Sequence, residues 1–379
     1  MRFLHLADLH IGKVLHKHSL MQDQAIILKQ ILQIAVEKKV DAVLIAGDVY
    51  QRINPAPEAM TLFSDFLASL SEMHLPCYLI AGNHDNAERI AYLSQLAARS
   101  DIHIAGAERA RIYSYPLEDA YGKITLHLLP FLAPPDARIA FPDEAESIVT
   151  YEDAVRTVLA HFPVSGGGRH VIVAHQLMTG AEICESEELA VGGQDNISAS
   201  LFDAYDYAAL GHLHGPQKVI RETIRYAGSP LRYSFSELTQ KKSVTVVELR
   251  EKGNVQIELV PLEQPHGMQE ITGTLESLRQ REQTDDYIHA IVTDDEPPAD
   301  AVRQLRSVFR NLLQVTFRSS KYREDRNVET GADPDALDFR SLLNRFYAFQ
   351  NNGQEPNADQ MKIVEKLMEQ LDRETERAL

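Results

Sequence analysis

Residues 78–89, "YLIAGNHDNAER", begin as an apolar strand and break off in Gly82-Asn83-His84-Asp85. A tight turn uses the glycine, and the asparagine also suits one. A turn does not need an imidazole and a carboxylate side by side, so His84 and Asp85 indicate chemistry rather than chain reversal alone. The stretch becomes informative if other strands of the chain end in the same way.

Four further predicted strands do end in side chains that bind metals. These are Asp8 and His10 in "ADLHIG", Asp48 in "AGDVY", His175 in "VAHQ", and His212 and His214 in "LGHLHG". In open α/β folds, sites form beyond the carboxyl ends of strands, so we expect these groups to meet with Asn83 at one place. Asp8 and His10 are two residues apart, as are His212 and His214, so in extended chain both members of each pair face the same side.

The chemistry of this set fits two divalent cations. Histidine supplies nitrogen, aspartate supplies charged oxygen, and asparagine supplies a neutral carbonyl oxygen, which together suit hard-to-borderline metals. One carboxylate, most simply Asp48, would bridge the two. Metals ~3.5–4 Å apart clamp the attacking and leaving oxygens of a displacement at phosphorus, with a metal-bound hydroxide as nucleophile.

Each motif taken alone also has an ordinary structural explanation. The chain has 15 histidines, a lone histidine is usually a surface or core residue, and "GNHD" alone is compatible with a simple turn. The ordered recurrence at the ends of five apolar runs is what favours a metal centre. The histidines that lack this setting are predicted to be structural or exposed, namely His5, His16, His18, His74, His127, His161, His170 and His266.

Composition narrows the class of protein without fixing the substrate. A length of 379 residues predicts two or three domains, and 44% hydrophobic with 25% charged residues is ordinary for a globular protein. No window approaches the ~18 apolar residues of a membrane span, no signal-peptide pattern is present, and two cysteines suggest no disulfide framework, so we expect a cytoplasmic protein. The net charge of −17 argues against a free-standing DNA-binding domain. Bound cations or a partner can still supply positive charge.

The order of apolar runs predicts a layered α/β domain over 1–262, followed by smaller parts. Strands are expected at 2–7, 41–47, 77–82, 124–130, 170–175, 207–212, 224–228, 243–250 and 255–262, and helices near 19–38, 57–73, 86–99 and 151–161. A small α/β module follows over 266–318, then a polar linker over 319–335 and two helices with apolar faces within 336–379. These helices either dock on their own chain or bind a partner, and binding to a partner groove or helix is the favoured interpretation.

As an ordered set, D-x-H … G-D … G-N-H-D … H … G-H-x-H resembles the calcineurin-like metallophosphoesterase superfamily. The stretches "HLADLHIGK", "SEELAVGGQDNIS" and "YAGSPLRYSFSE" narrow the resemblance to the family of SbcD-type and Mre-type nuclease subunits. This resemblance implies a β-sandwich flanked by helices and a small capping domain over 266–318 that positions DNA. It also implies C-terminal helices that bind the coiled coil of SbcC, an ATPase partner, and a homodimer that gives a heterotetramer.

The same resemblance implies roles for individual residues. One metal would be held by Asp8, His10, Asp48 and His214, and the other by Asp48, Asn83, His175 and His212, with manganese as the usual ion. His84 would contact the scissile phosphate and stabilise charge or protonate the leaving oxygen. Asp85 either orients that ring or caps the turn. Gln51 stands where some relatives carry a second histidine.

The leading hypothesis is therefore a metal-dependent DNA exonuclease and endonuclease, the catalytic subunit of an SbcCD-type complex that cleaves hairpins and processes double-strand ends. A stand-alone phosphodiesterase for small nucleotides is the alternative, and the extra module and helices weigh against it. A non-enzymatic scaffold is disfavoured by the complete ligand set. No G-x-x-x-x-G-K-[ST] loop is present, so the ATP machinery would lie in the partner.

Overall fold

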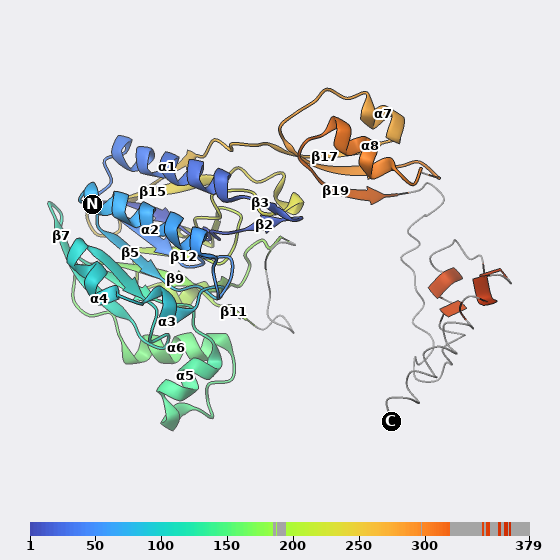
Figure 1. Ribbon diagram of the computed structural model, residues 1–379. Helices are drawn as coiled ribbons and strands as arrows, with labels where there is room; N and C mark the ends of the chain where they lie inside the picture. The colour runs from blue at the N-terminus through green and yellow to red at the C-terminus, as the bar shows by residue number, and fades with distance from the viewer. Residues whose placement is uncertain are drawn as a thin grey trace. The chain divides into compact units, whose positions relative to one another are not determined.

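The computed structural model describes residues 1–184, 187, 195–296 and 298–318, with scattered residues from 343 to 364. The chain forms two compact units, one of Met1–Gln269 with Asp285–Tyr287 and one of Glu270–Thr284 with Ile288–Leu379 (Figure 1). The linker predicted over 319–335 and most of the helices predicted within 336–379 fall outside the described residues. Among the residues that are described, no helix is both long and apolar enough to cross a membrane.

The first unit contains two six-stranded sheets, and the first sheet has the order β16-β15-β1-β4-β5-β6. Its four parallel strands are β1 (Arg2–Leu6), β4 (Ala42–Ala46), β5 (Cys77–Ile80) and β6 (Ile102–Ala105). At one edge lie the antiparallel strands β15 (Ser243–Leu249) and β16 (Val255–Pro261). Strand β4, "AVLIA", is buried along its whole length, as expected for a parallel strand that is covered on both faces.

The second sheet has the order β13-β14-β12-β9-β8-β7. Its parallel strands are β8 (Gly122–Leu129), β9 (Arg169–His175), β12 (Tyr207–Gly211) and β14 (Arg221–Tyr226). The antiparallel edge strands are β7 (Tyr113–Asp119) and β13 (Gln217–Val219). In both sheets the central parallel strands run in one direction, so their carboxyl ends lie together at one edge of each sheet.

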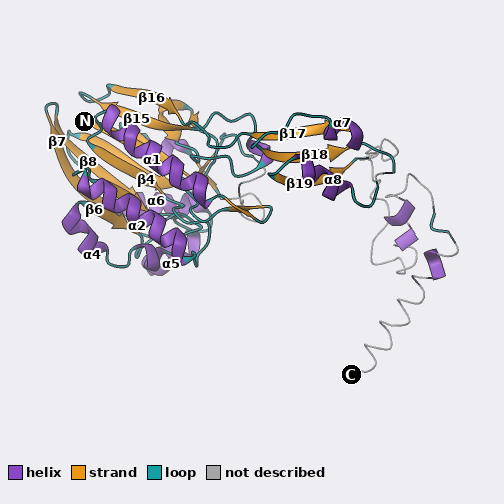
Figure 2. Ribbon diagram, turned by 45° about the horizontal axis from the view of Figure 1, so that its top comes forward, coloured by secondary structure: helices purple, strands orange, loops and turns teal. Residues whose placement is uncertain are grey.

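The main core lies between the two sheets and takes apolar side chains from both. Its buried members include Phe3, Leu44, Ile80, Leu128, Val171, Val173 and Tyr207. The other face of the second sheet packs on α5 (Pro134–Ala140) and α6 (Tyr151–His161). Helices α1 (Met21–Glu37) and α2 (Pro57–Glu72) lie side by side on the first sheet (Figures 1 and 2). The predicted β-sandwich flanked by helices is therefore confirmed.

Two helices begin where their sequences predict. Pro57 stands at the first helical position of α2, where its missing N–H leaves no donor unpaired. Helix α6 begins with a capping box, because the Thr150 side chain accepts from the Asp153 N–H and the Asp153 carboxylate accepts from the Thr150 N–H.

The helix predicted over 86–99 is wrong as a single element. The structure has two short helices there, α3 (Ala87–Ile90) and α4 (Ser94–Ala97), and the break falls at Leu93, whose φ of 61° lies in the left-handed region. A left-handed residue cannot continue an α-helix. Strand β7 was not predicted from the sequence, because it is an edge strand with half-exposed side chains and an internal Pro116.

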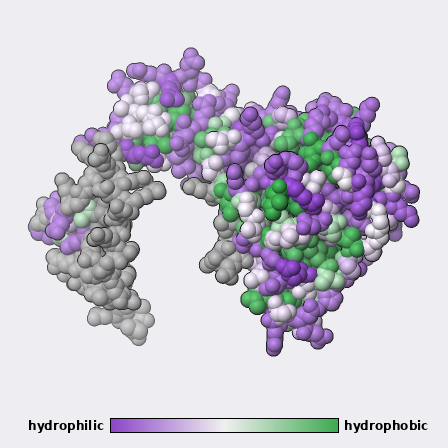
Figure 3. Space-filling model, turned by 180° about the vertical axis from the view of Figure 1, so that it is seen from behind, coloured by the Kyte–Doolittle hydropathy of each residue, from purple (hydrophilic) through white to green (hydrophobic). Residues whose placement is uncertain are grey.

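The remaining elements of the first unit are short. They are β2 (Val14–Leu15), β3 (His18–Ser19), β10 (Leu177–Met178), β11 (Asn196–Ile197) and the 3-10 helices η1 (Ala98–Ser100), η2 (Pro142–Glu144), η3 (Ala199–Phe202) and η4 (Phe235–Glu237). Its surface is largely hydrophilic with a few apolar patches on the face seen in Figure 3.

The second unit is built on a three-stranded sheet in the order β17-β18-β19. The strands are β17 (Met268–Gly273), β18 (Tyr287–Val292) and β19 (Leu312–Phe317), and the helices are α7 (Leu275–Arg279) and α8 (Ala301–Val308). Ile271, Leu278, Ile288, Leu305 and Phe309 are among the members of a core between sheet and helices. The alternation of strands and helices follows the order expected for 266–318.

Candidate metal centre

Five loops from the two sheets meet at the carboxyl ends of their strands. Asp8 and His10 follow β1, Asp48 follows β4, Asn83 and His84 follow β5, His175 ends β9, and His212 and His214 follow β12. The loops are joined through their backbones, since the Asp8 N–H donates to Gly47 O (3.1 Å) and the His10 N–H donates to Asp48 O (2.9 Å). The structure thus brings all eight predicted site residues into one place.

The backbone at this place is strained. Asp8, His10, Asp48 and His212 have φ values of 53°, 43°, 51° and 110°, in the region that residues other than glycine rarely adopt. Each such residue costs on the order of 1 kcal/mol, and strained residues cluster at functional sites. Gly47 lies among them because a Cβ there would fall 2.5 Å from His175 Nδ1.

One group of ligand atoms surrounds the side-chain oxygen of Asn83. His175 Nε2 lies 2.8 Å from Asn83 Oδ1, and His212 Nδ1 lies 3.1 Å from the same oxygen. His175 Nδ1 lies 2.7 Å from Ala46 O, an acceptor, so Nδ1 carries a proton and Nε2 is the nitrogen that faces the other ligand atoms. An amide oxygen and imidazole nitrogens at these separations form a donor set for a divalent cation.

A second group forms around His10 and His214. Their Nε2 atoms lie 3.1 Å apart. Among the residues that the structure describes, neither His10 Nδ1 nor Asp8 Oδ2, both buried, has a hydrogen-bond partner, although Asp8 Oδ1 accepts from the His212 N–H (2.9 Å). A buried carboxylate oxygen without a donor is costly, and a cation would satisfy it. The residues present therefore fit a pair of divalent metals.

Asp48 lies between the two groups. Its Oδ2 is 3.6 Å from His10 Nε2 and 3.4 Å from His175 Nε2, one histidine from each group. Its Oδ1 accepts from the N–H of His84 (2.9 Å). One carboxylate thus touches both groups of ligand atoms and the turn that carries His84.

His84 is more exposed than the most buried of the site residues. Its side chain is 16% exposed, against 3% or less for Asp48, His10 and His175, and its Nε2 lies 3.9 Å from Asp48 Oδ2. It lines a small pocket of about 20 Å³ together with five of the other site residues and with Lys13, Gln51 and Glu187. A ring nitrogen of His84 also lies within 4.8 Å of ligand atoms of His10 and Asp48, so His84 stays predicted as a non-ligand.

Burial and mutual charge shift the pKa values of the buried groups in opposite directions. Burial raises the pKa of Asp8 well above its usual value. Burial alone would also raise the pKa of Asp48, but nearby His175 outweighs it and holds this pKa well below the usual value. Burial lowers the pKa of His212 to about 3, whereas Asp48 overcomes burial at His175 and raises its pKa to about 9. Divalent cations would stabilise both carboxylates in their ionised form.

The structure decides between the two roles left open for Asp85. Its Oδ2 accepts from the N–H groups of Val49 (3.1 Å) and Gly82 (2.9 Å), and its Oδ1 accepts from Tyr50 N–H (3.0 Å). Both oxygens are engaged by backbone amides of the loops after β4 and β5. Asp85 therefore caps the turn and ties two ligand loops together.

Several residues that support the site carry no local sequence signal. The guanidinium of Arg109 donates to Gly82 O (3.3 Å), Asp85 O (3.0 Å) and Phe131 O (3.1 Å), so it braces the turn that holds Asn83 and His84. It comes from the loop between β6 and β7, where the sequence shows no motif. Lys13 lies in the stretch "HLADLHIGK" and Glu187 in the stretch "SEELAVGGQDNIS". Their place in these stretches was the only sequence signal that they belong to the site.

Family models match both parts of the chain. A model described as calcineurin-like phosphoesterase matches residues 1–216, and one described as type 5 capsule protein repressor C-terminal domain matches residues 264–351. The first covers every site residue named above.

Two relatives match nearly end to end, and both are named as the SbcD component of the nuclease SbcCD. The protein from Staphylococcus saprophyticus is 29% identical over 98% of this chain and 98% of its own length. The protein of the same name from Staphylococcus epidermidis is 27% identical over 99% of this chain and 100% of its own. Among solved structures, a dimetal phosphatase from Danio rerio has a TM-score of 0.40 at 12% identity and covers 69% of this chain and 99% of its own.

Proposed function

The chain belongs to the calcineurin-like phosphoesterase family, and from that premise we propose that it is a metal-dependent DNA nuclease, the catalytic subunit of an SbcCD-type complex. The observation that carries the proposal is the position of Asp48 Oδ2 between two groups of ligand atoms, beside the partly exposed His84. The substrate class comes from the two relatives whose printed name is nuclease and which match almost the whole chain.

The ligand assignment combines the two groups with the resemblance to the family. The distances put His10 with His214 and put Asn83 with His175 and His212, and Asp48 lies beside both groups. We assign Asp8 to the metal of His10 and His214 from the resemblance, and in the structure its carboxylate lies within 4.8 Å of ligand atoms of Asp48 and His175. Manganese is the proposed ion, because the resemblance to the family implies it, and a set that mixes imidazole nitrogens with hard oxygens is consistent with this metal. When bound, the two metals supply Lewis acidity and an activated water nucleophile for attack on a phosphodiester.

His84 acts as the general acid in this proposal. Its backbone N–H donates to Asp48 Oδ1, and its ring lines the pocket and is 16% exposed. An imidazole in this place donates a proton to the leaving oxygen of the phosphodiester or stabilises the charge that develops there. Asp85 and Arg109 fix the turn from which the ring projects.

The rim of the pocket suits a nucleic-acid backbone better than the net charge suggests. Lys13 lines the pocket, and it precedes a two-stranded hairpin whose tip is His16-Lys17, with φ values of 47° and 71°. Lysines placed beside a cleavage site contact phosphates. The acidic remainder of the chain leaves further phosphate contacts to the second unit or to the proposed partner SbcC.

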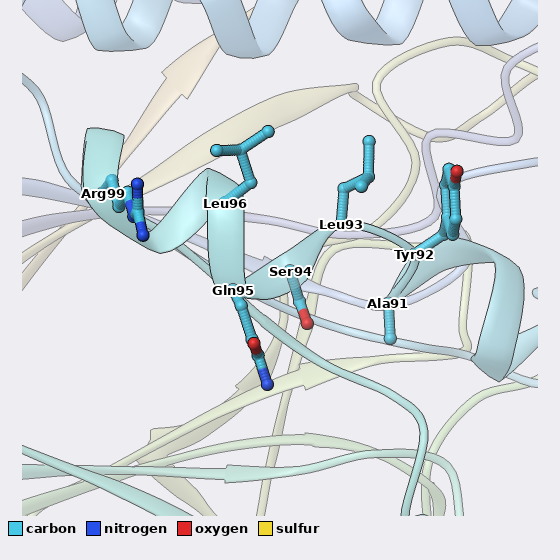
Figure 4. A pocket seen from close by; sticks show the side chains of 7 residues that line it. All are labelled: Ala91, Tyr92, Leu93, Ser94, Gln95, Leu96 and Arg99. Atoms are coloured by element: carbon cyan, nitrogen blue, oxygen red, sulfur yellow. The ribbon is translucent and has the colours of Figure 1, made fainter.

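Homodimerisation belongs to the same proposal, with a second copy of the chain as the occupant of an apolar patch. Tyr92, Leu93 and Leu96 are 74%, 55% and 57% exposed. Figure 4 shows these three side chains on one side of the segment and those of Ser94 and Gln95 on the other. A two-fold interface buries the same patch of both copies, and an exposed apolar cluster is a candidate for such a patch. Replacement of both leucines by glutamate should convert a dimer to a monomer in light scattering, and an unchanged dimer would reject this surface.

The small-nucleotide phosphodiesterase is not favoured, because the named relatives also match the second unit, which a small substrate does not require. Binding of SbcC by the C-terminal helices and a cytoplasmic location stay predictions.

Cleavage assays test the proposal. The full chain, with and without SbcC, is given hairpin and linear double-stranded DNA in manganese, and bis-p-nitrophenyl phosphate serves as the small substrate. We expect DNA cleavage that EDTA abolishes and manganese restores. Hydrolysis of the small diester with no cleavage of any DNA, even with SbcC, would overturn the assignment in favour of the small-nucleotide enzyme.

A further inference from the structure

A buried ion pair contacts the ring of one proposed metal ligand. His214 Nδ1 lies 2.9 Å from Glu237 Oε1, while His214 Nε2 is directed to His10 Nε2 at 3.1 Å. Lys242 Nζ donates to the other carboxylate oxygen, Glu237 Oε2, at 2.7 Å, and both side chains of this pair are 0% exposed. A charged pair so deep in a protein is weak evidence for stability, because removing the charges from water offsets much of their attraction. A positional role is therefore the better explanation.

The lysine reaches the main chain of the same ligand. Lys242 Nζ also donates to His214 O (2.9 Å), Ser229 Oγ (2.8 Å) and Gln240 Oε1 (2.7 Å). The ion pair thus contacts His214 twice, at its ring through Glu237 and at its carbonyl through Lys242. Rotation of the ring and displacement of its backbone are both restricted.

The stretch that ends in Glu237, residues 226–237, also supports two other ligand loops. Tyr226 hydroxyl donates to Gln176 O (2.8 Å), the residue after His175. Tyr233 hydroxyl donates to Leu9 O, between the first two ligands of the chain. The motif "YAGSPLRYSFSE" was noted in the sequence without a chemical role, and its polar side chains connect three ligand-bearing strand ends.

The close approach of this stretch to His214 requires a glycine. Gly228 has a φ of 76°, and a Cβ there would fall 2.7 Å from His214 O and 2.7 Å from Pro216 N. The next residue, Ser229, donates its N–H to His214 O at 3.0 Å. The backbone of the stretch therefore lies against the backbone of the ligand.

The contacts of Glu237 determine what His214 can present. Glu237 Oε2 accepts from Lys242 Nζ (2.7 Å) and from the Tyr233 N–H (3.2 Å), and its Oε1 faces His214 Nδ1 at 2.9 Å. An ionised carboxylate only accepts hydrogen bonds, so Nδ1 of the facing imidazole carries the proton and Nε2 keeps its lone pair. Carboxylates placed in this way fix the tautomer and orientation of metal-binding histidines.

We propose that Glu237 is a positioning residue of the metal centre, which holds His214 in the tautomer that binds through Nε2, and that Lys242 keeps Glu237 in place. The inference rests on the proposed function, since it concerns the metal assigned to Asp8, His10 and His214. It predicts an asymmetric effect, because the contacts that the structure describes for this pair lie at His214 and not at the other group of ligands, Asn83, His175 and His212.

The test begins with metal binding to the metal-free full chain. Manganese titration by calorimetry, with stoichiometry from elemental analysis, should give two ions for the wild type. For Glu237→Gln we expect one ion bound as before and the other weakened about 10- to 100-fold. The matched control is Glu222→Gln, since Glu222 also pairs with a lysine, Lys218, but both are exposed, and it should bind two ions as the wild type does.

Glu237→Gln leaves a buried lysine without its counter-charge, so a second variant covers the case in which it does not fold. Glu237→Gln combined with Lys242→Met removes both charges, which buried pairs often tolerate, and the same selective loss of one ion is expected. Two ions bound with wild-type affinity in a folded variant would overturn the inference while leaving the nuclease proposal intact. A wild type that binds no manganese would instead defeat the proposed function itself.

The tautomer of His214 can also be measured in the wild type, and a variant is needed only to assign its signal. Histidine-selective ¹⁵N labelling, with His214→Gln to assign the signal, reports which ring nitrogen carries the proton. We expect His214 in the metal-free chain to be the Nδ1–H tautomer, and an Nε2–H tautomer would contradict the positioning role.

Discussion

The two sheets of the sandwich contribute different chemistry to one centre. Every proposed oxygen ligand comes from loops of the first sheet, namely Asp8, Asp48 and Asn83, and the same loops carry the imidazoles of His10 and His84. The second sheet supplies imidazoles alone, from His175, His212 and His214. Each of the two ligand groups mixes donors from both sheets, so neither sheet holds a complete metal site.

Hydrogen bonds across the sandwich show how closely the two contributions depend on each other. His175, on the second sheet, is oriented by Ala46 O at the end of β4 in the first, 2.7 Å away. The His212 N–H, on the second sheet, donates to Asp8 Oδ1, on the first sheet, at 2.9 Å. Because each ligand group takes donors from both sheets, we infer that the centre forms only when the sandwich has assembled. Metal binding should therefore report on that assembly.

The largest expected effect comes from the residue that joins the two groups. Asp48→Asn keeps the size of the side chain but removes its charge, so we expect loss of two-metal binding and a fall in DNA cleavage of at least about 1,000-fold, since the metals supply several kcal/mol of transition-state stabilisation. Elemental analysis and a cleavage assay measure both. Asp65→Asn on the exposed face of α2 is the control. If the Asp48 variant retained both ions, the carboxylate of Asp48 would not be needed to hold the two metals.

A smaller loss is expected from His84, the imidazole of the site that comes from the first sheet and is not assigned to a metal. His84→Ala should lower kcat about 100- to 10,000-fold, the range for general acid catalysis, with both ions still bound. His161→Ala, on α6, should leave kcat unchanged. If the His84 variant lost an ion, His84 would move into the ligand set and the chemical division between the sheets would have to be redrawn.

Much of this comparison could be predicted from the sequence, because apolar runs that end in Asp, Asn or His mark strands and ligands at once. The residues that support the ligands could not be predicted. Glu237 lies 23 residues from His214 along the chain, and Arg109 comes from a loop with no motif, so only the folded chain shows that they brace ligands. The role of Asp85 also needed the fold, because the sequence left open whether its carboxylate orients the His84 ring or caps the turn, and only the folded chain shows both oxygens accepting from backbone amides. The helix predicted over 86–99 was wrong because a periodic pattern does not reveal a left-handed residue such as Leu93.

Metal removal should destabilise the sandwich as a whole. A site occupied at 100 times its Kd adds about 2.7 kcal/mol to the free energy of unfolding. We expect EDTA to lower the Tm in calorimetry and manganese to restore it. Asn83→Ala on the first sheet and His175→Ala on the second should each reduce the manganese-dependent shift. If only one of these two variants reduced the manganese-dependent change in Tm, one sheet would bind metal by itself.

The smallest effect concerns buried histidines away from the centre, one on each sheet. Burial lowers the pKa of His5, on β1, to about 3 and that of His127, on β8, to about 4, against an ordinary value of 6.5. The unfolded chain takes up these protons below pH 6.5 while the folded chain does not, so stability is complete above that pH and is lost as the pH falls. For His5 the slope is at most about 1.4 kcal/mol per pH unit.

Urea unfolding of the metal-free chain between pH 7 and pH 5 measures this slope. His5→Gln should flatten it, and His74→Gln, at an exposed position, should leave it unchanged. An equal slope in the wild type and the His5 variant would show that His5 takes up its proton in the folded protein.

Anomalous diffraction at the manganese edge, from a crystal of the full chain soaked in manganese, tests the central claim most directly. The account predicts two peaks ~3.5–4 Å apart with Asp48 bound to both, one peak beside His10 and His214 and the other beside Asn83, His175 and His212. A single peak, or a pair in which Asp48 binds only one ion, would contradict it.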